Sequence, residues 1–217
     1  MKISVIGAGL GGLAASAILA SKGHKVDLFE QNDTPGGKMQ EIREEGFRFD
    51  TGPSLLTMPF ILEQVFEACG KAASDYLEWI PTDPVCRYQF PDGSVFLNYH
   101  DPEKNRAELL RIAPEDVDSW DRFMDYSADL YRRTADTFLF NPLQGVRDLH
   151  VADLPDFMRI DAFQTVSKRV DDYFSSPRLR QLFKRFSTYN GSSPYQAPAT
   201  LNVIPYVELR LGGYYIR

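Results

Sequence analysis

Hydrophobic and polar positions fall into clear blocks near the N-terminus. A short β-branched run at residues 2–6 stops at glycine, and a second apolar run fills residues 25–29. Residues 13–21, between these runs, are small or apolar, and Gly23 follows them as a helix stop. This order predicts a buried strand, a helix and a second strand, which together form a parallel βαβ unit with a right-handed crossover.

The pattern changes along the rest of the chain. Residues 47–53 indicate a short strand that runs into a glycine turn, and residues 59–70 indicate a helix. An Asp-Gly pair between two aromatic-rich runs predicts a hairpin over residues 88–97. From residue 102 to residue 186 apolar and aromatic residues recur at helical spacing, which predicts a largely helical region with these side chains in its core.

Composition limits the class of protein. The 217 residues are 43% hydrophobic and 25% charged, which is ordinary for a globular chain of one or two domains. We expect a dinucleotide-binding domain over residues 1–85 and a substrate-facing, largely helical portion over residues 86–217. The net charge of −6 argues against a nucleic-acid partner. Cys69 and Cys86 lie outside any metal-ligand spacing, so we expect no metal site and two buried free thiols.

A glycine motif opens the predicted helix. The segment Gly7-Ala8-Gly9-Leu10-Gly11-Gly12 matches G-x-G-x-x-G directly after a strand. Gly7 permits the tight turn, Gly9 lets the backbone approach a diphosphate, and Gly12 lets the helix pack closely on the strand. We expect the diphosphate at the helix N-terminus, beside Leu10 and Gly11, where free N–H groups and the helix dipole favour an anion.

Polar residues after the second strand narrow the choice of dinucleotide. Glu30, followed by Gln31, ends this strand, and its carboxylate can accept hydrogen bonds from ribose hydroxyls while repelling a 2′-phosphate. Gly36-Gly37-Lys38 then offers a second backbone approach and a counter-charge, which favours FAD over NAD. The alternative interpretation of this segment is a polar β-turn with a solvated lysine.

The combined motifs resemble a known superfamily. The N-terminal pattern through Phe49-Asp50-Thr51-Gly52-Pro53 is similar to that of the FAD-dependent amine oxidases and carotenoid desaturases. Two later segments, residues 189–200 and residues 203–215, are similar to bacterial-type phytoene desaturases, hydroxycarotenoid desaturases and carotenoid isomerases. The resemblance implies a Rossmann-like FAD-binding α/β fold and adds Thr51 and Gly52 to the cofactor-binding residues.

The resemblance also implies an activity. These enzymes take a long apolar isoprenoid, such as phytoene, from the membrane and desaturate it by hydride transfer to the flavin. Asp156 and Arg159 have an Asp-x-x-Arg spacing like one in the desaturases, so they are candidate catalytic residues; a solvated ion pair is the alternative. We therefore expect an FAD-dependent carotenoid desaturase; the sequence does not define its oligomeric state.

Two other functions stay open. One is a flavin amine oxidase, and the other is a truncated dinucleotide-binding module without chemistry. Because the family's chains usually run to about twice this length, we expect only their N-terminal part here, with uncertain activity. The N-terminus is unlike a signal peptide, and no apolar run approaches the roughly 20 residues needed to span a bilayer. The expected location is cytoplasmic, peripheral to the inner face of the membrane. The apolar run at residues 137–143 is a candidate contact for lipid or for a long apolar substrate; a buried helix end is the alternative.

Overall fold

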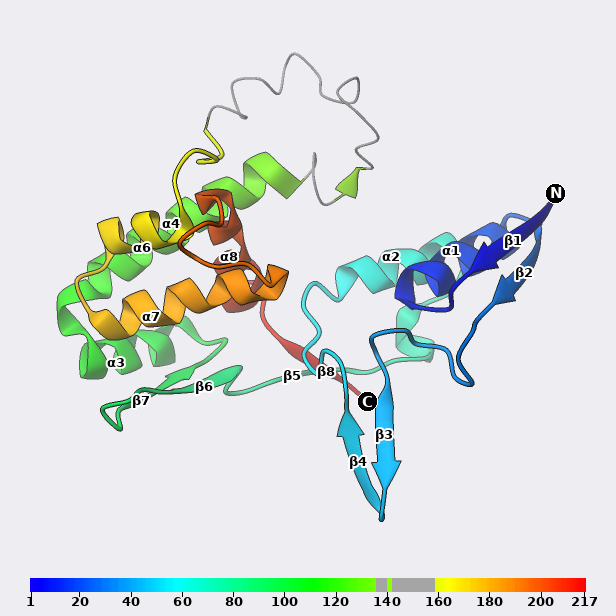
Figure 1. The fold of residues 1–217 in the computed structure, drawn as a ribbon, viewed down its shortest axis with the longest axis horizontal. Coiled ribbons are helices and arrows are strands. Elements are labelled where there is room, and N and C mark those ends of the chain that lie inside the picture. The colour runs from blue at the N-terminus through cyan, green and yellow to red at the C-terminus, as the bar shows by residue number, and fades with distance from the viewer. Residues whose placement is uncertain (136–139, 142–158) are drawn as a thin grey trace. The chain divides into compact units, whose positions relative to one another are not determined.

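The predicted βαβ unit is confirmed at the N-terminus of the computed structural model, which describes residues 1–135, 140–141 and 159–217. Strands β1 (Lys2–Ile6) and β2 (Lys25–Phe29) pair in parallel, and helix α1 (Leu10–Ser21) connects them (Figure 1). The helix begins at Leu10, earlier than expected, because the second half of the glycine motif already has helical backbone.

The prediction that the first strand is buried is wrong. No residue of β1, α1 or β2 is buried, and Ile6 is 89% exposed. Within the described part of the chain this sheet contains only two strands. Helix α1 packs over the face that carries Val5, while Ile6 and Phe29 lie paired on the opposite face. Parallel sheets are usually covered on both faces, so their hydrophobic pattern alone suggests more burial than two strands can provide.

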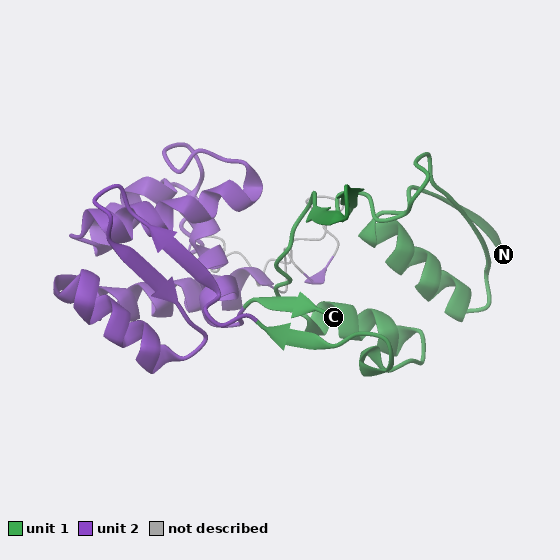
Figure 2. Ribbon diagram, turned by 90° about the horizontal axis from the view of Figure 1, so that it is seen from below, with its two compact units in different colours: residues 1–81, 213–217 green, residues 82–212 purple. Residues whose placement is uncertain are grey.

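The first unit contains residues 1–81 and 213–217 (Figure 2). The sequence-based division after residue 85 differs from this one because the last strand of the chain pairs antiparallel with a strand that ends at Pro81. The predicted strand near residue 47 is half of an antiparallel hairpin. The remaining elements of this unit are α2 (Phe60–Ala68), η1 (Ala73–Asp75), β3 (Glu41–Glu44), β4 (Phe47–Asp50), β5 (Trp79–Pro81) and β8 (Tyr214–Ile216).

The second unit contains residues 82–212 and is mainly helical, as predicted (Figure 2). It begins with the predicted antiparallel hairpin, whose turn holds Gly93 at a φ of +82°. Its described elements are β6 (Cys86–Gln89), β7 (Val95–Asn98), α3 (Pro102–Ile112), η2 (Pro114–Asp116), α4 (Val117–Thr134), α6 (Val166–Tyr173), α7 (Pro177–Arg185), η6 (Phe186–Asn190), η7 (Ala199–Asn202) and α8 (Val203–Leu209).

Aromatic side chains form the core of the second unit. Phe123 on α4 is fully buried, and its ring centroid lies 4.5 Å from that of Phe183 on α7. Phe174 stacks on Phe183 at 4.7 Å, and Trp120 lies 5.1 Å from it. The aromatic residues at helical spacing are therefore core residues, as their periodicity predicts.

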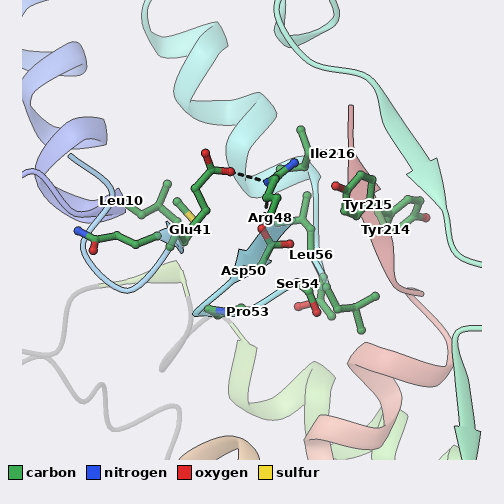
Figure 3. Close-up of a pocket in the computed structure, with 14 residues that line it drawn as sticks. Leu10, Glu41, Arg48, Asp50, Pro53, Ser54, Leu56, Tyr214, Tyr215 and Ile216 are labelled. Atoms are coloured by element: carbon green, nitrogen blue, oxygen red, sulfur yellow. Dashed lines mark hydrogen bonds and ion pairs between the residues drawn. The ribbon is translucent and has the colours of Figure 1, made fainter. Parts of the chain in front are cut away.

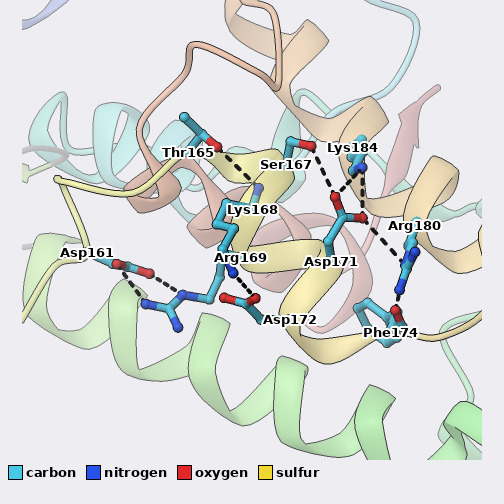
Figure 4. A network of polar contacts seen from close by, with 10 residues as sticks. All are labelled: Asp161, Thr165, Ser167, Lys168, Arg169, Asp171, Asp172, Phe174, Arg180 and Lys184. Atoms are coloured by element: carbon cyan, nitrogen blue, oxygen red, sulfur yellow. Dashed lines mark hydrogen bonds and ion pairs between the residues drawn. The ribbon is translucent and has the colours of Figure 1, made fainter.

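Ion pairs fix helix α6 to its surroundings. Arg169 donates from Nε and Nη2 to the two carboxylate oxygens of Asp161, at 2.6 and 2.9 Å (Figure 4). From the neighbouring helix α7, Lys184 donates to Oδ2 of Asp171 at 2.9 Å (Figure 4). The first pair is bidentate and half-buried, a geometry that holds both partners more firmly than a single surface contact.

Candidate dinucleotide-binding site

The glycine turn has the geometry that a phosphate-binding turn requires. Gly7 has a φ of +96°, which side chains rarely tolerate. A Cβ atom on Gly12 would lie 1.9 Å from the carbonyl oxygen of Gly7, so only glycine fits at this position. Gly9 is the N-cap of α1 and, as a glycine, provides no side chain to cap this end of the helix. The first-turn N–H groups are therefore available to an anion.

A second glycine loop lies against the first. The N–H of Gly36 donates to the carbonyl oxygen of Ala8 at 2.8 Å, and Gly36 forms an isolated parallel bridge with Gly9. A Cβ atom on Gly37 would lie 3.1 Å from Cα of Gly9, so a side chain here would crowd the turn. Gly36 and Gly37 also have positive φ angles of +126° and +61°. Two bare stretches of backbone thus meet next to the start of α1.

Glu30 follows β2 and is held by hydrogen bonds. Its Oε2 accepts from the N–H of Ala8 at 2.7 Å. Its Oε1 accepts from the N–H groups of Gln31 and Asn32 at 2.9 and 3.0 Å, and from Nδ2 of Asn32 at 2.9 Å. The backbone N–H groups of Asn32 and Ala8 lower the pKa of Glu30 most strongly, so the carboxylate is ionised at neutral pH. An anionic acceptor favours ribose hydroxyls and disfavours a 2′-phosphate.

These groups line one cavity of about 530 Å³, a size typical of a small-molecule site. Five residues predicted to bind the cofactor lie around it together. The lining residues are Ile6, Gly7, Gly9, Phe29, Glu30, Gln31, Asn32 and Gly37. The bare backbone, the uncapped helix end and the anionic ribose acceptor together fit the ADP half of a dinucleotide.

Three of the lining residues are absent from the sequence-based prediction. Ile6 and Phe29 are the last residues of β1 and β2, and they lie opposite each other in the parallel ladder. Because ligands of open α/β sheets bind at the carboxyl ends of the strands, the predicted strand ends were the signal for this pair. Asn32 carried no recognisable signal, since only the fold shows that it reaches Glu30.

Two predicted residues from the start of α1 lie elsewhere. Leu10 lines a second cavity instead of the first. Gly11 has open space where its Cβ would be, so its role as a close-approach glycine has no steric support in this structure. Their backbone N–H groups nevertheless belong to the uncapped first turn of the helix.

Packing of the backbone explains the glycine at position 52, in the turn after β4. A Cβ atom on Gly52 would lie 1.8 Å from the carbonyl oxygen of Lys38, so Gly52 allows two backbone segments to touch. Thr51 donates from both its N–H and its hydroxyl to the carbonyl oxygen of Gln40, each at 2.9 Å. Lys38 is exposed and does not line the cavity. The roles of Lys38, Thr51 and Gly52 toward a cofactor stay predictions.

The second cavity, of about 510 Å³, lies in the same unit (Figure 3). Arg48 occupies its polar side, where its Nε lies 2.5 Å from Glu41 and its Nη2 lies 3.0 Å from Asp50. The two carboxylates, Asp50 first, raise the pKa of Arg48. Tyr214 and Tyr215 from β8 line another side of the cavity (Figure 3). This cavity is largely apolar with one ion-paired side.

The candidate catalytic pair cannot be assembled from the described residues. Asp156 lies outside them, as does most of the apolar run at residues 137–143, and Arg159 is exposed. Cys69 and Cys86 are free, as expected, but they are only partly buried. Within the described ranges, no group of three or more His, Cys, Asp or Glu side chains is placed to hold a metal. No described helix is long and apolar enough to cross a membrane.

The fold and this site define a Rossmann-like dinucleotide-binding protein. The family described as "NAD(P)-binding Rossmann-like domain" matches residues 5–71. The chain also resembles a solved triple mutant of putrescine oxidase, with a TM-score of 0.63 at 15% sequence identity over 99% of this chain and 45% of that one. This likeness shows the fold that the protein shares with the amine oxidases.

Curated relatives match the chain over almost its full length. The 4,4′-diapolycopene oxygenase of Methylomonas sp is 39% identical over 218 residues, which are 100% of this chain and 44% of the relative. The 1-hydroxycarotenoid 3,4-desaturase of Flavobacterium sp. is 35% identical over 99% of this chain and 44% of the relative. The chain is similar over its whole length to these two enzymes, and it spans less than half the length of these relatives.

Proposed function

We propose that this chain holds the ADP half of FAD in an oxidoreductase that desaturates a carotenoid-like polyene. The observation that carries the proposal is the single cavity around which the glycine turn, the second glycine loop and the ionised Glu30 converge. The names of the relatives supply the substrate class, because they include an oxygenase and a desaturase of carotenoids.

The arrangement of the two cavities supports a ligand longer than ADP. Gly9 lines the first cavity, and its neighbour Leu10 lines the second. A dinucleotide with its diphosphate at the start of α1 therefore has space on both sides of this segment. When bound, FAD supplies the acceptor for the hydride removed from the substrate.

The residues of this chain have defined tasks in binding. Glu30 accepts hydrogen bonds from the ribose, and the N–H groups of the first turn of α1 bind the diphosphate. Gly9 and Gly37 keep side chains away from the diphosphate. By resemblance to the desaturases, Asp156 and Arg159 are proposed to take part in removing the proton that leaves the substrate.

We further propose that the protein works at the inner face of the membrane, from the cytoplasmic side. The support is chemical: a long apolar polyene dissolves in lipid and not in water, so the enzyme must meet it at a bilayer surface. Cosedimentation with phospholipid vesicles tests binding to the membrane surface, and fractionation of the native host tests the location on the cytoplasmic side. Protein that stays in the supernatant with and without carotenoid in the vesicles would argue against the membrane proposal.

Titration with FAD tests the cofactor. We expect the purified protein to quench the fluorescence of the flavin, to shift its absorption bands, and to bind FAD more tightly than NAD. The matched variant Glu30→Lys should weaken FAD binding because it replaces the ribose acceptor with a cation. A protein that takes up NAD but no FAD would refute the flavoprotein proposal.

The substrate is tested separately with lipid-embedded polyenes. Incubation of the native, flavin-loaded protein with phytoene in liposomes should lengthen the chromophore and colour the sample. Turnover of a hydroxylated carotenoid but not of phytoene would move the proposal to a neighbouring activity within the family. Oxidation of amines alone would identify an amine oxidase, and FAD binding without any turnover would identify a non-catalytic module.

A further inference from the structure

The hydrogen bonds of Glu30 are unequally divided between its two oxygens. Oε1 has three donors, the N–H of Gln31 and both the N–H and the side-chain amide of Asn32, at 2.9 to 3.0 Å. Among the described residues, Oε2 has one donor, the N–H of Ala8 in the glycine turn, at 2.7 Å. An ionised carboxylate offers about two acceptor positions on each oxygen. Oε1 is therefore saturated, and the described part of the chain leaves one acceptor position of Oε2 open.

Among these donors, the amide of Asn32 is the contribution that depends on residue type. The other three are backbone N–H groups, which every residue except proline supplies at these positions. Glu30 has a flexible side chain with several rotamers. A fixed donor on Oε1 selects the rotamer in which Oε2 lies next to the glycine turn.

We infer that Asn32 is the positioning residue of the ribose site: it holds Oε1 of Glu30 so that Oε2 is left to accept a ribose hydroxyl. This inference rests on the proposed function, since it concerns the same cavity, which Asn32 also lines. It makes the site selective as well as preformed, because a carboxylate fixed in this orientation excludes a phosphate on the ribose.

Two ligands that differ by one phosphate provide the test. ADP-ribose and 2′-phospho-ADP-ribose are titrated into the wild type and its variants by isothermal calorimetry, with circular dichroism to verify folding. We expect Asn32→Ala to weaken ADP-ribose about fivefold, the effect of one hydrogen bond to an exposed charged group, and to weaken the phosphorylated ligand less. The preference of the protein for ADP-ribose over 2′-phospho-ADP-ribose should therefore decrease in this variant.

Asn32→Asp is the sharper variant, because it keeps the size of the side chain but replaces the donor with a second carboxylate beside Glu30. It should weaken ADP-ribose more than Asn32→Ala does. Thr34→Asp is the matched control: it adds the same charge two residues along the exposed turn, at a position that does not line the cavity. Its affinity should stay within about twofold of the wild type.

The outcomes separate the inference from the proposed function. A wild type that binds neither ADP-ribose nor FAD overturns the proposed function and this inference with it. A wild type that binds both, with an Asn32→Ala variant of unchanged affinity, overturns the inference alone. Equal losses for the two ligands would indicate that Asn32 only stabilises the turn, and would also overturn it.

Discussion

Replacing Gly12 with alanine is the sharpest test of the glycine turn. The new Cβ would lie 1.9 Å from the carbonyl oxygen of Gly7. An ordinary C···O contact is roughly 3.3 Å, so α1 must move by about 1 Å or more relative to the turn. Overpacking of this kind costs about 1–3 kcal/mol. The same shift moves the first-turn N–H groups away from the diphosphate, so FAD binding should weaken by at least about tenfold.

Hydrogen exchange measured by mass spectrometry resolves this effect, because the two units need not unfold together. In Gly12→Ala the amides of residues 13–21 should exchange roughly 5- to 150-fold faster, which corresponds to a loss of about 1–3 kcal/mol. Gly11→Ala is the stability control, because its Cβ meets nothing within 4 Å. It should slow exchange in the helix, by up to about 1 kcal/mol of stabilisation. Equal behaviour of the two variants would refute the argument from packing.

Three further predictions concern charge and core packing. The pKa of Glu30 is lowered, so its ionised form contributes fully to ribose binding at every pH above the ordinary value of 4.5. The affinity for ADP-ribose should therefore stay constant from pH 7 to about pH 5 and fall only below the ordinary pKa. Glu30→Gln should abolish this fall. Glu208→Ala removes the ion-pair partner of Arg185: Nη2 of Arg185 lies 2.9 Å from the carboxylate of Glu208, which is 2% exposed. The free energy of unfolding of the second unit, measured with urea, should fall by about 3 kcal/mol. An unchanged urea midpoint would contradict the contribution of this pair. Phe123→Ala should cost about 3–5 kcal/mol in the same assay, against about 0.5 kcal/mol or less for Leu110→Ala on the exposed side of α3.

Local patterns were sufficient for the elements and for the backbone part of the site. The β-branched runs and the glycine spacing predict β1, α1 and β2 because strand pairing and helix formation depend on neighbouring residues. The positions of Gly7, Gly9 and Glu30 follow from the same short unit, whose loops are too short to place them elsewhere. The hairpin around Gly93 and the aromatic core of the second unit are predictable for similar reasons.

Other features depend on residues that are distant in the sequence. The division into two units depends on β8, which returns to pair with β5. The real constraint on Gly52 is the carbonyl oxygen of Lys38, a contact that its own neighbours do not reveal. The exposure of Ile6 depends on the number of strands in its sheet, and a hydrophobic pattern does not reveal that number.

The sequence by itself determined the kind of ligand this protein holds, because a glycine turn, a helix end and an acid at the end of a strand are fixed by local geometry. Only the tertiary structure decided how the ligand site is set. It brought Gly36 against the glycine turn and the side-chain amide of Asn32 within hydrogen-bonding distance of Oε1 of Glu30. The physical reason is that backbone conformation is largely local, whereas the orientation of a carboxylate depends on every donor that the fold brings within hydrogen-bonding distance.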